Sequence, residues 1–160
     1  GSIFTIELPL LDVDGGRSNS TGERQLARVP ERPAFTRSVL LVDDEPMVRR
    51  SMGRLLRRAG FEVVEAASGT EALAEYGRRP HDLVLLDLNM PGMNGEATQQ
   101  RLLALDANVK IVFATGHGDA MRETALKARG ALGVLEKPYT LEALFEILLG
   151  EPELEPPTRT

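Results

Sequence analysis

Residues 38–59 read SVLLVDDEPMVRRSMGRLLRRA, and this stretch sets the pattern of the chain. A short run rich in valine and leucine ends in three acidic residues, and Pro46 then opens a segment with helical spacing of its apolar residues. Proline is well tolerated in the first helical turn, and Gly60 stands where helices commonly stop. We therefore predict a strand over 38–42, an acidic turn and a helix over 46–59.

The same alternation occurs five times between residues 38 and 149. The remaining strands are predicted over 62–65, 83–87, 110–114 and 133–135. The remaining helices are predicted over 69–77, 95–105, 120–129 and 141–149. Apolar strands that alternate with helices are typical of an α/β fold, in which helices cover both faces of a parallel sheet.

Length and composition exclude several classes of protein. The 160 residues suffice for one domain with flanking segments, and 42% hydrophobic with 27% charged residues is typical of a globular protein. No apolar run approaches the roughly 18 residues of a membrane span, so we expect no membrane contact by this fragment. The absence of cysteine and the presence of only two histidines argue against a disulfide framework, a thiol nucleophile and cysteine-ligated zinc. The formal charge of −5 argues against nucleic acid as a partner.

The segments that flank this domain differ from it in composition. Within residues 1–11, apolar Phe4, Ile6 and Leu8 alternate with Thr5, Glu7 and Pro9, which predicts a short strand that ends at the proline. Residues 12–37 are rich in glycine, serine and proline with mixed charge, which predicts a flexible linker. Residues 150–160 contain three prolines and three glutamates, and we expect a disordered tail there.

At four of the five predicted strands, a residue with a reactive side chain stands at the carboxyl end. In open parallel α/β sheets, ligands bind outside the carboxyl ends of the strands. Three carboxylates that converge in that region would repel one another, so they call for a divalent cation with oxygen ligands, and Mg²⁺ suits such a site. An ammonium and a hydroxyl nearby would complete a clamp for a phosphoryl group. The residues concerned are Asp43 and Asp44 after the first strand, Asp87 as the last residue of the third, Thr115 after the fourth and Lys137 after the fifth.

Each of these residues also has an ordinary structural interpretation. Asp43 and Asp44 could cap the helix that begins at Pro46. Asp87 could simply precede a turn, because the residues after it are of the types that form turns. Lys137 could be an extended residue before a proline whose side chain is merely solvated. Coincidence at four strand ends is improbable, so we favour the functional interpretation.

These residues resemble the response-regulator receiver domain over the whole of 38–149. The matching stretches are LLVDDEP (40–46), DLNMPGMNG (87–95), ATG (114–116) and EKPY (136–139). The resemblance implies a flavodoxin-like, doubly wound (βα)5 fold with strand order 2-1-3-4-5. It also implies that the domain accepts a phosphoryl group from a phosphohistidine and changes conformation to regulate two-component signalling.

The resemblance assigns a role to each matching position. It implies that Asp87 is the phosphoacceptor, that Mg²⁺ (or Mn²⁺) is held by Asp43, Asp44, Asp87 and the main-chain carbonyl of Asn89, and that Thr115 and Lys137 contact the phosphoryl group. The Lys137–Pro138 peptide would be cis. Such a domain catalyses only its own phosphorylation and dephosphorylation.

Three further positions near this site carry expectations. Gly116 leaves room for a phosphoryl group beside Thr115. His117 lies close enough in sequence to modulate access of water to an acyl phosphate, although a histidine in a loop is usually just solvated. Val134 departs from the resemblance, because the position three before Lys137 is often an aromatic that swings inward during the switch.

The partners predicted from the sequence are the phosphohistidine-bearing helices of a histidine kinase or a histidine phosphotransfer protein. The helix over 46–59 carries five arginines that would attract an acidic partner at long range. They are Arg49, Arg50, Arg54, Arg57 and Arg58.

Residues 1–10 resemble the closing strand of the ATP-binding domain of sensor histidine kinases, with Phe4 followed by Leu8-Pro9. This resemblance predicts a hybrid histidine kinase with a receiver at its C-terminal end, a cytoplasmic location, and a parent kinase that is itself membrane-associated in some cases. An unrelated leader is the alternative interpretation of residues 1–11.

Two other functions remain open from the sequence. One is a Mg²⁺-dependent phosphohydrolase that uses an aspartyl phosphate, although Asn89 cannot supply the proton that a leaving group needs. The other is a receiver-like interaction module that is never phosphorylated.

Overall fold

The computed structural model describes residues 38–150, so the predictions for residues 1–37 and 151–160 lie outside the described residues. The strands are β1 (Ser38–Val42), β2 (Glu62–Ala66), β3 (Leu83–Asp87), β4 (Ile111–Thr115) and β5 (Gly133–Glu136). The helices are α1 (Pro46–Arg58), α2 (Gly69–Arg78), α3 (Gly95–Leu105), α4 (Ala120–Ala128) and α5 (Leu141–Leu149). Every predicted element of the domain is present, and no boundary differs by more than one residue.

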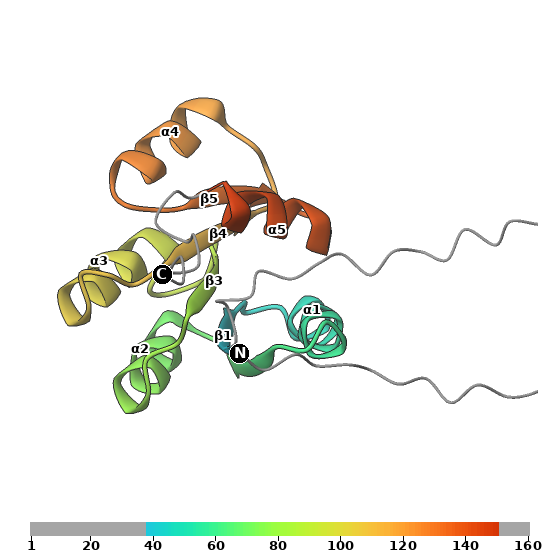
Figure 1. The fold of residues 1–160 in the computed structure, drawn as a ribbon. Helices are drawn as coiled ribbons and strands as arrows, with labels where there is room; N and C mark the ends of the chain where they lie inside the picture. Colours follow the sequence, from blue (N-terminus) through green and yellow to red (C-terminus); the bar gives the residue numbers. More distant parts are fainter. Residues whose placement is uncertain (1–37, 151–160) are drawn as a thin grey trace, which may run out of the picture.

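The strands form one parallel sheet in the order β2-β1-β3-β4-β5, so the predicted fold class and strand order are confirmed. The described part of the chain begins in β1, moves to β2 at the near edge, and then crosses back past β1 to build β3, β4 and β5 in turn, which is doubly wound topology. Figure 1 shows α1 and α5 on one face of the sheet and α2, α3 and α4 on the other. Within residues 38–150, no helix is both long and apolar enough to cross a membrane.

Alternate residues of each strand contribute to two separate cores, because successive side chains of a strand point to opposite faces. On one face, Leu40, Leu86 and Phe113 pack against Tyr76 of α2 and Leu102 of α3. On the other face, α1 and α5 cover the sheet through Met52, Leu56, Leu144, Phe145 and Leu148. Both faces of the central strands are therefore buried, which explains why β1, β3 and β4 lack polar alternation.

The start of α1 differs from the starts of the other helices. Side chains cap α2, α3 and α5 at Ser68, Asn94 and Thr140, whereas Glu45 at the cap of α1 makes no side-chain capping bond. The interpretation of Asp43 and Asp44 as caps of this helix is therefore wrong. The Asp43 carboxylate instead accepts a hydrogen bond from the Glu45 amide at 2.8 Å, which shapes the turn before the helix.

Candidate functional site

The carboxyl ends of four strands bring the predicted site residues into one row. Val42 of β1 pairs with Leu86 of β3, so Asp43 and Asp87 come next on neighbouring strands. Asp87 in turn pairs with Ala114 of β4, and the Lys137 amide donates to the Thr115 carbonyl at 2.8 Å. The doubly wound strand order thus places residues that are up to 94 positions apart within contact distance.

Three carboxylates and one ammonium meet at the centre of this row. Asp43, Asp44 and Asp87 each offer an oxygen, and these atoms lie within 4.8 Å of one another. The Lys137 Nζ donates to Asp43 Oδ2 at 2.7 Å and lies 3.1 Å from Asp87 Oδ2. Asp43 and Asp87 are buried, while Asp44 is partly exposed, so the cluster opens to solvent at Asp44.

The electrostatics of Asp87 and Lys137 follow from burial and from their mutual contact. Burial raises the pKa of Asp87 above its ordinary value, and the hydrogen bond from the Asn89 amide at 3.1 Å and the charge of Lys137 offset part of that rise. Burial alone would lower the pKa of Lys137, but its hydrogen bond to Asp43 and the charges of both aspartates outweigh burial and raise it. Lys137 is therefore a cation at neutral pH.

The donor set at this site fits a hard divalent cation. Three carboxylates against one ammonium leave an excess of two negative charges, which one divalent cation would balance. Oxygen ligands at an open, partly hydrated position are what Mg²⁺ prefers, because it retains several of its waters. Asn89 lies two residues beyond Asp87, and its main-chain N–H donates a hydrogen bond to Asp87 Oδ1, which folds this segment back over the carboxylate.

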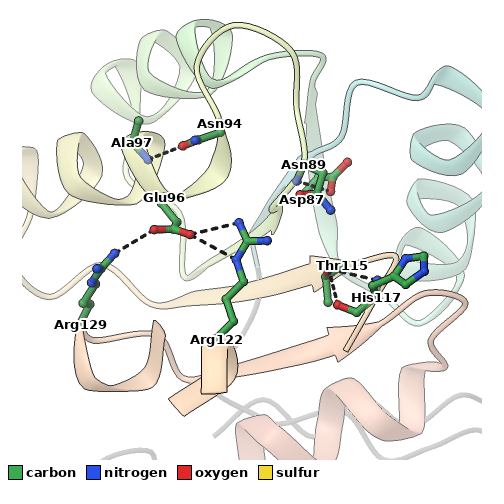
Figure 2. Close-up of polar contacts among 9 residues, drawn as sticks. All are labelled: Asp87, Asn89, Asn94, Glu96, Ala97, Thr115, His117, Arg122 and Arg129. Atoms are coloured by element: carbon green, nitrogen blue, oxygen red, sulfur yellow. Dashed lines mark hydrogen bonds and ion pairs between the residues drawn. The ribbon is translucent and has the colours of Figure 1, made fainter. Parts of the chain in front are cut away.

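Thr115 ends β4 beside Asp87, and its hydroxyl is engaged with the following loop (Figure 2). The Oγ1 atom donates to the His117 carbonyl at 3.0 Å and accepts from the His117 amide at 3.3 Å. Gly116 and His117 are exposed, and a Cβ built on Gly116 would meet no heavy atom of the described residues within 4 Å. The backbone at Gly116 is therefore open on the side that a side chain would occupy, while the Thr115 hydroxyl itself is buried and bonded to His117.

Two features of β5 and the segment directly after it concern the predicted switch position and Lys137. The Lys137–Pro138 peptide is cis, as the resemblance implies. Val134, which pairs with Phe113 of β4, is half-buried and packs against the core beneath α2, α3 and α4. A valine at this position has no ring to swing between an exposed and a buried position.

Arg49 is a contributor that the sequence analysis did not single out for this site. Its Nη1 donates to the Asp43 main-chain carbonyl at 2.6 Å, and its Nε lies 3.7 Å from Glu65 of β2. Arg57 also pairs with Glu65, at 2.9 Å. A cation in the first turn of a helix interacts unfavourably with the helix dipole. The position of Arg49 near the start of the predicted helix was therefore the signal in the sequence that this arginine has a specific role.

A sheet of this order with an acidic cluster and a lysine at its carboxyl edge defines a class of α/β switch domains. A model of the response regulator receiver domain matches residues 39–149. The chain therefore belongs to the response regulator receiver domain family, the phosphoacceptor modules of two-component signal transduction.

Individual relatives agree with this assignment. The chain is 36% identical to the chemotaxis protein CheY of Thermotoga maritima over 112 residues, which cover 69% of this chain and 92% of CheY. It is 38% identical over 109 residues to the C4-dicarboxylate transport transcriptional regulatory protein DctD of Rhizobium meliloti, covering 68% of this chain. That match spans only 24% of DctD, so the activities of such longer relatives do not transfer with it.

A solved structure shows the same fold. The response regulator protein TrrA of Thermotoga maritima, crystallised in complex with Mg²⁺ and BeF, superposes with a TM-score of 0.62 at 29% identity. The superposition covers 69% of this chain and 94% of TrrA.

Proposed function

We propose that this domain accepts a phosphoryl group on Asp87 and that Asp43, Asp44 and Lys137 make the transfer possible. The observation that carries the proposal is the cluster itself, in which three carboxylate oxygens lie within 4.8 Å and the Lys137 Nζ bridges two of the carboxylates. Such a cluster is costly for the fold, because buried like charges repel one another. A function that uses these charges accounts for that cost.

The metal ligands in this proposal are Asp43, Asp44, Asp87 and the main-chain carbonyl of Asn89. Mg²⁺, or Mn²⁺ in its place, would neutralise charge on the phosphoryl oxygens when bound. The TrrA complex with Mg²⁺ and BeF supports this choice of ion. The partly exposed Asp44 leaves an open side through which a hydrated ion enters.

In the proposed transfer, an Asp87 carboxylate oxygen attacks the phosphorus of a phosphohistidine. The new P–O bond forms as the P–N bond breaks, and the electron pair returns to the imidazole of the donor. The Lys137 ammonium, 3.1 Å from Asp87 Oδ2, lies where it can stabilise negative charge on the phosphoryl oxygens. Asp43 holds that ammonium in place at 2.7 Å.

Thr115 would report the modification to the rest of the domain. Its hydroxyl now bonds to the backbone of His117, and it must give up its bond to the His117 carbonyl to donate to a phosphoryl oxygen. This exchange of hydrogen-bond partners would shift the loop after Thr115 that leads into α4. His117, exposed in this loop, is proposed to affect the approach of water to the acyl phosphate.

The surface proposed for the partner is a groove between α1 and the segment after β5. It is lined by Met47, Val48, Leu55, Lys137 and Tyr139, among others. Met47 is 69% exposed and Leu55 is 43% exposed, so α1 presents apolar side chains to solvent at this groove. A groove with apolar walls that ends at Lys137 suits the helices of a histidine kinase or phosphotransfer protein.

Four of the five arginines of α1, the helix that lines one side of this groove, are exposed, and we propose that three of them attract an acidic partner. They are Arg50, Arg54 and Arg58. Arg49 and Arg57 instead form ion pairs with Glu65 within the domain, so they attract a partner less strongly.

We further propose that the domain serves a hybrid histidine kinase in the cytoplasm. The support is the resemblance of residues 1–10 to the last strand of a kinase ATP-binding domain, with residues 12–37 as a linker and 38–149 as the receiver. Residues 1–37 lie outside the described part of the chain, so this proposal rests on the sequence.

Labelling with acetyl phosphate tests the proposal. Intact-mass spectrometry of the full chain in Mg²⁺ should show a gain of one phosphoryl group that disappears with a chelator and in Asp87→Asn. Lys137→Ala should still be labelled but should respond less. Stoichiometric labelling of Asp87→Asn would contradict the assignment, and turnover of phosphate esters would support a phosphohydrolase instead.

A further inference from the structure

Glu96 joins the two segments that flank the candidate site. It lies in the first turn of α3, directly after Gly95, whose amide donates to the Leu88 carbonyl at 3.1 Å. A Cβ on Gly95 would lie 2.6 Å from the Asp87 carbonyl oxygen, so the start of α3 is packed against the backbone of Asp87 itself. Glu96 is therefore fixed in position relative to Asp87.

The Glu96 carboxylate binds both ends of α4 (Figure 2). Its Oε1 accepts from Arg122, with Nη2 at 3.1 Å and Nε at 3.3 Å. Its Oε2 accepts from Arg129 Nη1 at 2.9 Å. Gln99, buried one turn further along α3, donates to the Arg129 carbonyl at 3.5 Å and adds to the same connection.

Few other contacts hold α4. All nine of its residues are described, and Leu126 alone among them is buried, while Met121 is 84% exposed. The helix begins at Ala120, five residues after Thr115, so any displacement of the loop at His117 acts directly on it. The bonds to Glu96 therefore stand beside the buried Leu126 as contacts that fix the position of α4.

We propose that Glu96 is a positioning residue that, through Arg122 and Arg129, holds α4 in the arrangement of the unphosphorylated domain. This inference rests on the proposed function, in which Thr115 turns from His117 toward a phosphoryl group. A contact made in only one of two arrangements shifts the equilibrium between them by its own free energy. Because Val134 provides no aromatic switch, the ion pairs at Glu96 set how readily the domain adopts the phosphorylated arrangement.

The expected size of the effect follows from the partial exposure of these ion pairs. The side chains of Glu96, Arg122 and Arg129 are 30%, 41% and 52% exposed, so each pair is weakened by solvent. Loss of both pairs should shift the equilibrium about two- to tenfold. The shift should shrink in high salt, since the screening length falls from about 10 Å at 0.1 M to about 3 Å at 1 M.

Titration of the full chain with beryllofluoride in Mg²⁺, followed through backbone amide resonances, tests this role. Glu96→Gln should bind beryllofluoride about two- to tenfold more tightly than the wild type at low salt. Before any addition, its Gly118 and Met121 resonances should already lie part of the way toward the bound positions. Glu123→Gln is the matched control, because it breaks an exposed ion pair with Lys127 that lies within α4.

The pairing itself is tested by a double-mutant cycle. Arg122→Gln should produce a smaller gain in the same direction, and Glu96→Gln with Arg122→Gln should gain no more than Glu96→Gln alone. Equal or weaker binding by both single variants, with a wild type that binds, would overturn the role of Glu96 but leave the proposed function intact. A wild type that does not bind beryllofluoride would overturn both. If Glu96→Gln fails to fold, Arg122→Gln carries the same test.

Discussion

Gly95 is the residue whose size the site tolerates least. A Cβ there would lie 2.6 Å from the Asp87 carbonyl oxygen and 2.8 Å from the Leu88 Cα, both of which are backbone atoms that cannot rotate away. We expect Gly95→Ala to destabilise the domain by about 1–3 kcal/mol, the usual cost of an overpacked position. Denaturant unfolding measures this change.

Gly77 supplies the control for that experiment. It lies in α2, and a Cβ there would meet no described atom within 4 Å. Gly77→Ala should leave stability unchanged or raise it by about 0.5–1 kcal/mol, because alanine loses less backbone entropy in a helix. Equal effects of the two substitutions would contradict the close contact at Gly95.

His81 gives the domain a predicted dependence on pH. It is 7% exposed, and its Nδ1 has no hydrogen-bond partner among the described residues. Burial, with the nearby charge of Arg79, lowers the pKa of His81 below its ordinary value of about 6.5. As the pH falls through about 6.5, His81 binds a proton more readily in the unfolded chain than in the folded one, so the free energy of unfolding decreases.

The melting temperature should therefore decrease between pH 7.5 and pH 5.5, and His81→Gln should flatten that slope. His117→Gln, which changes the exposed histidine, is the comparison variant and should keep the slope. A slope that persists in His81→Gln but disappears in His117→Gln would contradict the assignment of this pH dependence to His81.

At the scale of single residues, the sequence predicted which residues gather at the candidate site, but it did not predict the ion pairs around that site. Asp43, Asp87, Thr115 and Lys137 could be predicted to lie together because each is the last residue of a strand or the residue directly after one, and strand ends can be read from local pattern. The partners of Glu96 could not be read in this way, because they lie 26 and 33 residues away and look like any solvated charge. Such pairings depend on how helices pack, which local pattern does not encode.

Among the elements, α4 differs from its neighbours in how little of it is buried. Leu126 is its one buried residue, whereas α3 buries Gly95, Thr98, Gln99 and Leu102. Few buried contacts lower the free energy of local opening. We expect the amides of α4 to exchange with solvent faster than those of α3 and α5 in a hydrogen-exchange experiment without Mg²⁺.

Protection of α4 equal to that of α3 would contradict this view of a weakly held helix. The prediction does not depend on phosphorylation, so it tests the packing by itself. The boundaries of these helices were predictable within one residue, since capping residues and apolar spacing mark them locally. The difference in burial between α3 and α4 was not predictable, because both sequences carry similar helical patterns.

For the whole molecule, the excess of acidic charge at the carboxyl edge of the sheet links folding to metal binding. An ion that binds only the folded state raises stability, by about 2.7 kcal/mol at a concentration one hundred times its Kd. We expect Mg²⁺ to raise the melting temperature, and Asp44→Asn to reduce that rise. Asp44 is the best choice, because Asp43 also supports Lys137.

An equal ionic strength of NaCl is the control for this measurement. If NaCl stabilises the domain as much as Mg²⁺ does, the carboxylates respond to general screening and no specific cation site is present. The architecture that creates this acidic edge was predictable as a whole, since the strand order follows from the family pattern and places β1 and β3 side by side.

The most direct test of the central claim locates the phosphoryl group chemically. The full chain is treated with acetyl phosphate and Mg²⁺, and borohydride then reduces any acyl phosphate, which converts the modified aspartate to homoserine. Peptide mass spectrometry should find homoserine at position 87 and at neither 43 nor 44. Homoserine at another aspartate, or none in a protein that gains a phosphoryl group, would contradict the assignment of Asp87.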